Sequence, residues 1–105
     1  MKAMIRDWLK QQFGDDESLI CELYSQYRID MEAGLQALKE IYTMEDDMKL
    51  REKAHAMKGM ALIVGDQETA NVLVALQHAC EVKERDTQEG LIEKLDALIA
   101  AMSVE

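Results

Sequence analysis

Three residues in the middle of the chain, His55, Lys58 and Gly59, have the types and the spacing to do chemistry together. Side chains three and four residues apart lie on one face of a helix. A neutral imidazole is a nucleophile, and its unperturbed pKa of about 6.5 leaves much of it neutral at cellular pH. The Lys58 ammonium would favour the neutral ring and later balance a phosphoryl group's negative charge. A glycine inside a helix costs about 1 kcal/mol relative to alanine. Gly59 therefore indicates a bare landing site for a phosphoryl group and its donor.

His55 has three possible interpretations. A lone helical histidine is most often a core or rim residue with a satisfied hydrogen bond, but that role explains neither Lys58 nor Gly59. A metal ligand needs companion ligands, whereas positions 51, 58, 59 and 62 of the same face offer Arg, Lys, Gly and Leu. A nucleophile accounts for all three residues. The second histidine, His78, lies off the apolar stripe of its segment and is interpreted as an ordinary surface residue.

The rest of the sequence supplies little for autonomous catalysis. It has no paired carboxylates on the His55 face, no glycine-rich phosphate loop and no serine or cysteine nucleophile with a base. Any metal ion and acid chemistry would have to come from a partner protein. The chain is thus expected to be a carrier of phosphoryl groups rather than an enzyme.

The residues that position His55 follow a helical period throughout the chain. Apolar stripes at spacings of three and four cover residues 4–13, 19–42, 50–64, 70–80 and 91–102. The central helix is predicted over residues 44–64, with Thr43 as its N-cap and Gly65 as a left-handed C-terminal cap. Because the connections are short, neighbouring helices should run antiparallel. We therefore expect an all-α fold, an up-down-up-down four-helix bundle with a short additional N-terminal helix.

Length and charge exclude several classes of protein. The 105 residues are expected to form a single domain, residues 1–105. The net charge of −9 argues against a nucleic-acid-binding protein, although a basic window surrounds His55. No apolar run approaches the ~20 residues of a membrane span, and the start does not resemble a signal peptide. The cytoplasm is the expected location, with Cys21 and Cys80 as reduced, buried thiols. The initial Met favours a stand-alone protein, and the charge favours a monomer.

The stretch from Ala54 to Gly65, AHAMKGMALIVG, resembles the signature of histidine phosphotransfer (HPt) domains of two-component phosphorelays. The family pattern reads AHxLKGxAxxLG, and the predicted helix order resembles that of the family over nearly the whole chain. Three positions depart from the residues that are usual in the family. Met60 and Leu62 stand where the family has smaller or more polar residues, and Gln77 stands where it often has glutamate. Met60 and Leu62 either widen an apolar docking patch or serve only in packing, and Gln77 does not touch the proposed chemistry.

The resemblance implies a role for each site residue. His55 would accept the phosphoryl group from the aspartate of a response-regulator receiver domain and pass it to another, with Mg²⁺ held by the receiver and none by this chain. Lys58 would steady the phosphoryl oxygens. Gly59, Arg51 and Leu62 would contact the docked partner, either a receiver domain or a hybrid sensor histidine kinase with its receiver. The alternative is a bundle that binds a receiver or another signalling protein without transferring phosphate. A buried or hydrogen-bonded His55 would favour that alternative.

Overall fold

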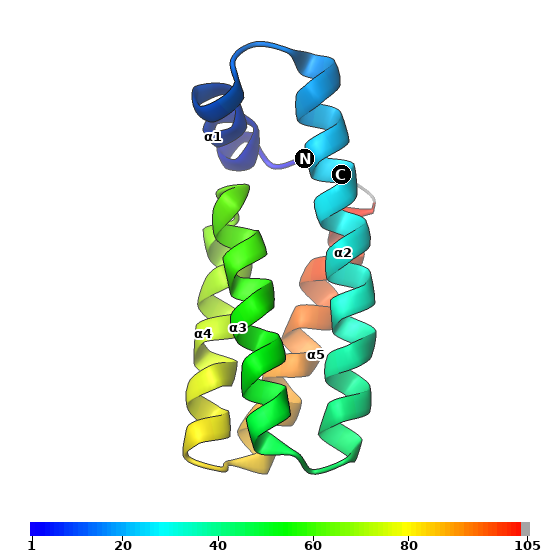
Figure 1. Ribbon diagram of the computed structural model, residues 1–105, viewed down its shortest axis with the longest axis vertical. Coiled ribbons are helices and arrows are strands. Elements are labelled where there is room, and N and C mark those ends of the chain that lie inside the picture. The colour runs from blue at the N-terminus through cyan, green and yellow to red at the C-terminus, as the bar shows by residue number, and fades with distance from the viewer. Residues whose placement is uncertain (104–105) are drawn as a thin grey trace.

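The computed structural model describes residues 1–103, and these form five α-helices (Figure 1). They are α1 (Ala3–Phe13), α2 (Glu17–Thr43), α3 (Asp47–Ile63), α4 (Gln67–Glu81) and α5 (Arg85–Met102). No strand occurs in this part of the chain, so the all-α prediction is confirmed. Within residues 1–103, no helix combines the length and the apolar character needed to cross a lipid bilayer.

The four longer helices lie side by side, and Figure 1 shows each of them running opposite to the one before it. Helix α3 packs against α2 and α4, and α5 packs against the same two helices. The elements thus enclose one core along an elongated body of 44 × 20 × 17 Å. Helix α1 lies across one end of this body, next to the C-terminal end of α3 (Figure 1).

The core is built from the apolar stripes that the sequence predicts on the four long helices. On α1 the predicted stripe is buried at Ile5 and Leu9 but exposed at Met4, Trp8 and Phe13. On α3 the stripe is completely buried, and the same holds for the central positions of the other long helices. Burying a large apolar side chain stabilises the fold by about 1.5–3 kcal/mol, so these contacts hold α3 in one rotation about its axis. The buried residues of α3 are Leu50, Ala54, Met57 and Ala61.

Helix α3 begins with Asp46 as its N-cap. The Asp46 carboxylate accepts a hydrogen bond from the Lys49 N–H at 3.0 Å, which satisfies one of the free donors of the first turn. The prediction of Thr43 as the N-cap is wrong, because α2 continues through Thr43 and its hydroxyl donates to the Glu40 carbonyl at 2.6 Å. The chain then turns through Glu45, whose φ is +57°, before α3 starts.

Helix α3 ends where the sequence predicts, at a left-handed Gly65 with φ of +74°. The Gly65 N–H donates to the Leu62 carbonyl at 3.2 Å, and the Asp66 N–H donates to the Ala61 carbonyl at 2.9 Å. This is the Schellman pattern that closes the last turn of a helix. An added Cβ at Gly65 would lie only 2.7 Å from Cβ of Trp8, so the site admits no side chain while α1 is docked.

Candidate functional site

His55 lies on the face of α3 that points away from the core. It is exposed, whereas Ala54 and Met57 beside it are completely buried. Within residues 1–103 the imidazole makes no hydrogen bond or ion pair, so neither ring nitrogen is held by a protein partner there. The ring is therefore not the satisfied core histidine of the first interpretation.

Lys58 is half-buried on the same side of α3, three residues after His55. Side chains on a helix lean toward its N-terminus, so a residue at i+3 extends back over the turn that carries residue i. No acidic side chain in the described part of the chain pairs with the Lys58 ammonium. The Lys58 ammonium is thus one helical turn from His55 and is not engaged by an acidic side chain of the described residues.

The packing of the chain does not explain why residue 59 of α3 is a glycine. A Cβ added there would meet no atom within 4 Å. Gly34 on α2 is different, because an added Cβ would lie 2.9 Å from the Sδ and Cε atoms of Met57, where α2 and α3 cross closely. The packing of the chain therefore requires space at Gly34 but not at Gly59.

Arg51 extends toward α4 rather than toward His55. Its Nε donates to the Glu81 carboxylate at 3.0 Å, and His78 lies on the other side of Glu81 with an Nδ1–Oε2 distance of 3.9 Å. Both partners of the Arg51 pair are about half exposed, so the pair contributes at most about 1 kcal/mol to stability. His78 is 74% exposed, which confirms its interpretation as a surface residue.

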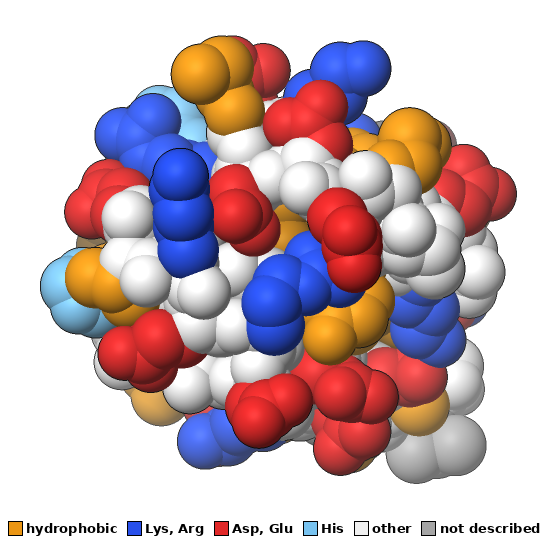
Figure 2. All heavy atoms as spheres, turned by 90° about the horizontal axis from the view of Figure 1, so that it is seen from below, with side chains coloured by type: hydrophobic (Ala, Val, Ile, Leu, Met, Phe, Trp, Pro, Cys, Tyr) orange, Lys and Arg blue, Asp and Glu red, His pale blue; other side chains and the backbone are white. Residues whose placement is uncertain are grey.

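The charges near the site are mostly cations without an acidic partner among the described residues. Among the described residues, Arg51 is the one cation of the window that pairs with an acid, and Lys49 and Lys53 have no such partner. Figure 2 shows the end of the bundle opposite α1, where acidic and basic side chains are interspersed. A partner would therefore meet local positive charge around His55 on a chain whose net charge is −9.

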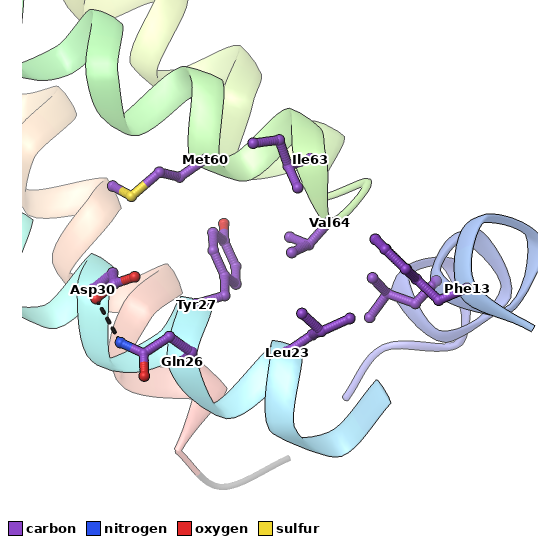
Figure 3. Close-up of a pocket in the computed structure, with 9 residues that line it drawn as sticks. Phe13, Leu23, Gln26, Tyr27, Asp30, Met60, Ile63 and Val64 are labelled. Carbon is purple, nitrogen blue, oxygen red and sulfur yellow. Dashed lines mark hydrogen bonds between the residues drawn. The ribbon is translucent and has the colours of Figure 1, made fainter. Parts of the chain in front are cut away.

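Met60 and Leu62, two of the positions that depart from the family's usual residues, have different environments. Leu62 is 43% exposed and lines a shallow surface pocket together with residues of α1. Met60 is half-buried, packs against the core and also lines a hollow between α1, α2 and α3 (Figure 3). Phe13 and Ile63 line the same hollow, and the sequence pattern of α3 does not reveal them as a group. The exposure of Phe13 on an otherwise amphipathic helix is visible only in the fold.

A buried polar cluster holds the end of α3 against α2. The Tyr27 hydroxyl donates to Oδ2 of Asp66 at 2.8 Å, and the Thr69 hydroxyl donates to the same oxygen at 2.7 Å. Burial and the neighbouring Asp66 carboxylate raise the pKa of Tyr27 far above its usual value of 10. The Tyr27 hydroxyl is thus protonated at neutral pH and serves as a structural hydrogen-bond donor.

Burial raises the pKa of Cys80 to about 11, so this thiol stays protonated at neutral pH. The expectation of a buried thiol is wrong for Cys21, which is exposed and lines a shallow pocket with Arg6 and Arg28. No group of three or more His, Cys, Asp or Glu side chains that could hold a metal ion occurs in the described part of the chain. Among the described residues, His55 is consequently the best candidate for a nucleophile.

Comparison with known proteins identifies the family. The family model of the Hpt domain matches residues 22–105, which includes α3 and all of the residues proposed for the site. No curated protein and no solved structure matches the chain. Because the family model covers most of the sequence, the chain belongs to the Hpt domain family, whose members transfer phosphoryl groups through a histidine in phosphorelays.

Proposed function

We propose that this protein is a histidine phosphocarrier that relays a phosphoryl group between the aspartates of response-regulator receiver domains, with His55 as the acceptor. The observation that carries the proposal is the exposed His55 ring on α3, which makes no hydrogen bond within residues 1–103. Lys58 and the bare turn at Gly59 support it, because they provide a cation and room for a partner.

The transfer step balances with groups on two proteins. An unprotonated ring nitrogen of His55 attacks the phosphorus of the receiver's acyl phosphate, and a new N–P bond forms as the P–O bond to the aspartate breaks. The aspartate leaves as a carboxylate. The other ring nitrogen keeps its proton or releases it to water. Transfer to the next receiver is the reverse reaction with a different aspartate.

Each remaining residue of the site has a role in this proposal. Lys58 stabilises the phosphoryl oxygens, and Gly59 lets the partner's active-site loops approach the ring. Arg51, which extends toward α4, and the exposed Leu62 contact the docked receiver. The chain itself needs no cofactor, because the receiver brings Mg²⁺ to the reaction.

The proposal also covers the setting of the site. Residues 1–105 act as one domain, an up-down-up-down four-helix bundle with α1 added at one end, and the protein works as a monomer in the cytoplasm. It is a carrier without autonomous catalysis. Its partners are receiver domains, including those attached to hybrid sensor histidine kinases.

The test uses radiolabelled, phosphorylated receiver domains from the source organism. Label should move to the purified protein, and the product should be labile in acid and stable in base. His55→Gln should abolish labelling with an unchanged helical circular dichroism spectrum, whereas His78→Gln, the matched control, should label normally. If receivers bind but no label moves, the protein is the non-transferring interaction module instead. Label on the His55→Gln variant would place the acceptor elsewhere.

A further inference from the structure

Arg51 lies on the His55 side of α3, but its side chain is held by α4, the helix that runs beside α3 (Figure 1). Its Nε donates to Oε1 of Glu81 at 3.0 Å. Within residues 1–103 the guanidinium makes no other hydrogen bond, so most of its N–H donors are unused. Both side chains are about half exposed, and exposed pairs of this kind are weak. A stronger acceptor nearby could therefore take Arg51 from Glu81.

The His55 ring lies within reach of the Arg51 side chain. Arg51 precedes His55 by four residues, so their Cβ atoms are about 5–6 Å apart on one face of α3. Helical side chains lean toward the N-terminus, so the His55 ring extends back over the turn that carries Arg51. The long Arg51 side chain can thus reach a group bound to the ring by rotation about its own bonds, without any movement of α3.

A phosphoryl group on His55 would compete with Glu81 for this guanidinium. A phosphorylated side chain carries a charge of about −1.5 to −2 and three acceptor oxygens, whereas a glutamate carries a single negative charge and two oxygens. Guanidinium groups bind phosphate oxygens through two parallel N–H···O bonds, while Arg51 gives Glu81 one hydrogen bond. The phosphoryl group is therefore the stronger acceptor of the two.

The charges around the pair favour this exchange. Glu81 has a second neighbour on its own helix, because Nδ1 of His78 lies 3.9 Å from its Oε2. On α3, Glu52 is an exposed carboxylate one turn before His55, and it forms no ion pair with any described residue. It would repel a phosphoryl group on the ring. A second cation beside Lys58 would offset that repulsion.

We infer that Arg51 leaves Glu81 when His55 is phosphorylated and binds the phosphoryl oxygens as a second cation beside Lys58. The inference rests on the proposed function and adds a phosphoryl-binding residue to it. It applies to the phosphorylated protein between two transfers, before a receiver contacts Arg51. Glu81 competes for the guanidinium and holds it on α4 until the ring carries phosphate.

The test needs no receiver. Phosphoramidate is a small molecule that phosphorylates the ring directly, as its P–N bond breaks and ammonia leaves. In heteronuclear NMR spectra, the Nε–H resonance of Arg51, assigned by its loss in Arg51→Lys, should shift when the protein is phosphorylated. The midpoint of a phosphorus NMR pH titration should also depend on Arg51, because a nearby cation disfavours proton uptake by the phosphorylated ring. Arg51→Ala should raise that midpoint by roughly half a unit, below the roughly 1–3 units of close pairs because the site is exposed.

Three further variants separate binding by Arg51 from a general effect of charge. Arg51→Lys keeps the charge but not the planar fork, so it should restore only part of the shift. Lys39→Ala is the matched control, because it removes a cation from the Lys39–Asp96 pair, which is also about half exposed and joins α2 to α5. Its midpoint should equal that of the wild type. In a Glu81→Gln background, Arg51→Ala should raise the midpoint at least as much as in the wild type. A smaller rise would mean that Glu81 does not compete for Arg51 and would contradict the inference.

Both readouts must respond for the inference to hold. If phosphorylation leaves the Arg51 resonance unchanged, or if Arg51→Ala and Lys39→Ala give the same midpoint, the inference is wrong while the proposed function stands. If neither phosphoramidate nor a phosphorylated receiver labels His55 in the wild type, the proposed function fails and the inference with it. Circular dichroism checks that every variant keeps its helices.

Discussion

Replacement of Gly59 by alanine should make the protein more stable and less active. Gly59 is inside α3, and an added Cβ would meet no atom within 4 Å. The substitution therefore creates no clash, and it removes a helix cost of about 1 kcal/mol. For a domain of this size, a gain of 1 kcal/mol raises Tm by roughly 4–8 °C.

The same methyl group should slow transfer from a receiver. Gly59 is one turn from His55, and a methyl group there would push an approaching backbone outward. A displacement of about 1 Å between reacting groups can cost on the order of 10²-fold in rate. We expect Gly59→Ala to lower the transfer rate at least about tenfold, while direct labelling by phosphoramidate stays unchanged because that small donor does not touch the turn.

Gly90 on α5 provides the matched control. Like Gly59, it is inside a helix and has no atom within 4 Å of an added Cβ; Gly90 is exposed and Gly59 is partly buried. Gly90→Ala should raise Tm by a similar amount and leave transfer unchanged. The assays are thermal unfolding by circular dichroism and the initial rate of label transfer from one receiver. If Gly59→Ala and Gly90→Ala transfer equally well, the bare turn has no part in docking. A fall in Tm for Gly59→Ala would contradict the open environment of Gly59.

Three further outcomes are expected. Lys58→Ala should lower receiver-dependent transfer about tenfold, less than the roughly 10²-fold lost with one donor in a buried site, and Lys58→Arg should restore part of it; equal rates would remove Lys58 from the mechanism. The raised pKa of Tyr27 means that the folded chain keeps a proton that the unfolded chain releases above pH 10. That contribution to the free energy of unfolding is therefore complete below pH 10 and falls by about 1.4 kcal/mol per pH unit above it. Urea unfolding between pH 9 and 11 should show this slope in the wild type and a shallower one in Tyr27→Phe. Alkylation at pH 8, followed by mass spectrometry, should modify the exposed Cys21 and spare Cys80, whose pKa burial raises to about 11, until the chain unfolds; equal reactivity would contradict that burial.

The features that the sequence predicts correctly depend on residues within a turn or two of each other. The stripe Leu50, Ala54, Met57 and Ala61 identifies the buried side of α3 because helical periodicity is a local property. It also places His55 on the solvent-facing side, because a fixed rotation per residue means that the buried face of a helix determines its exposed face. The stop at Gly65 follows from its tolerance of positive φ.

Helix boundaries are less certain from sequence, because several residues compete for the same role. Thr43 and Asp46 are both good N-cap residues, three positions apart. Helix α2 extends through Thr43, where the hydroxyl bonds to its own preceding turn, and Asp46 becomes the cap. The last helix begins at Arg85, six residues before the apolar stripe that starts at residue 91.

Contacts between distant residues were decided by the tertiary structure alone. The pairing of Arg51 with Glu81 joins residues 30 positions apart, and the hydrogen bond from Trp8 to Ile63 joins residues 55 apart. Neither contact leaves a periodic signal, because each depends on the relative placement of whole helices. The amino-acid sequence by itself determined which potentially nucleophilic side chain of α3 faces solvent. Only the packing of α1 against the end of α3 created the hollow beside it, since that site exists on no single helix.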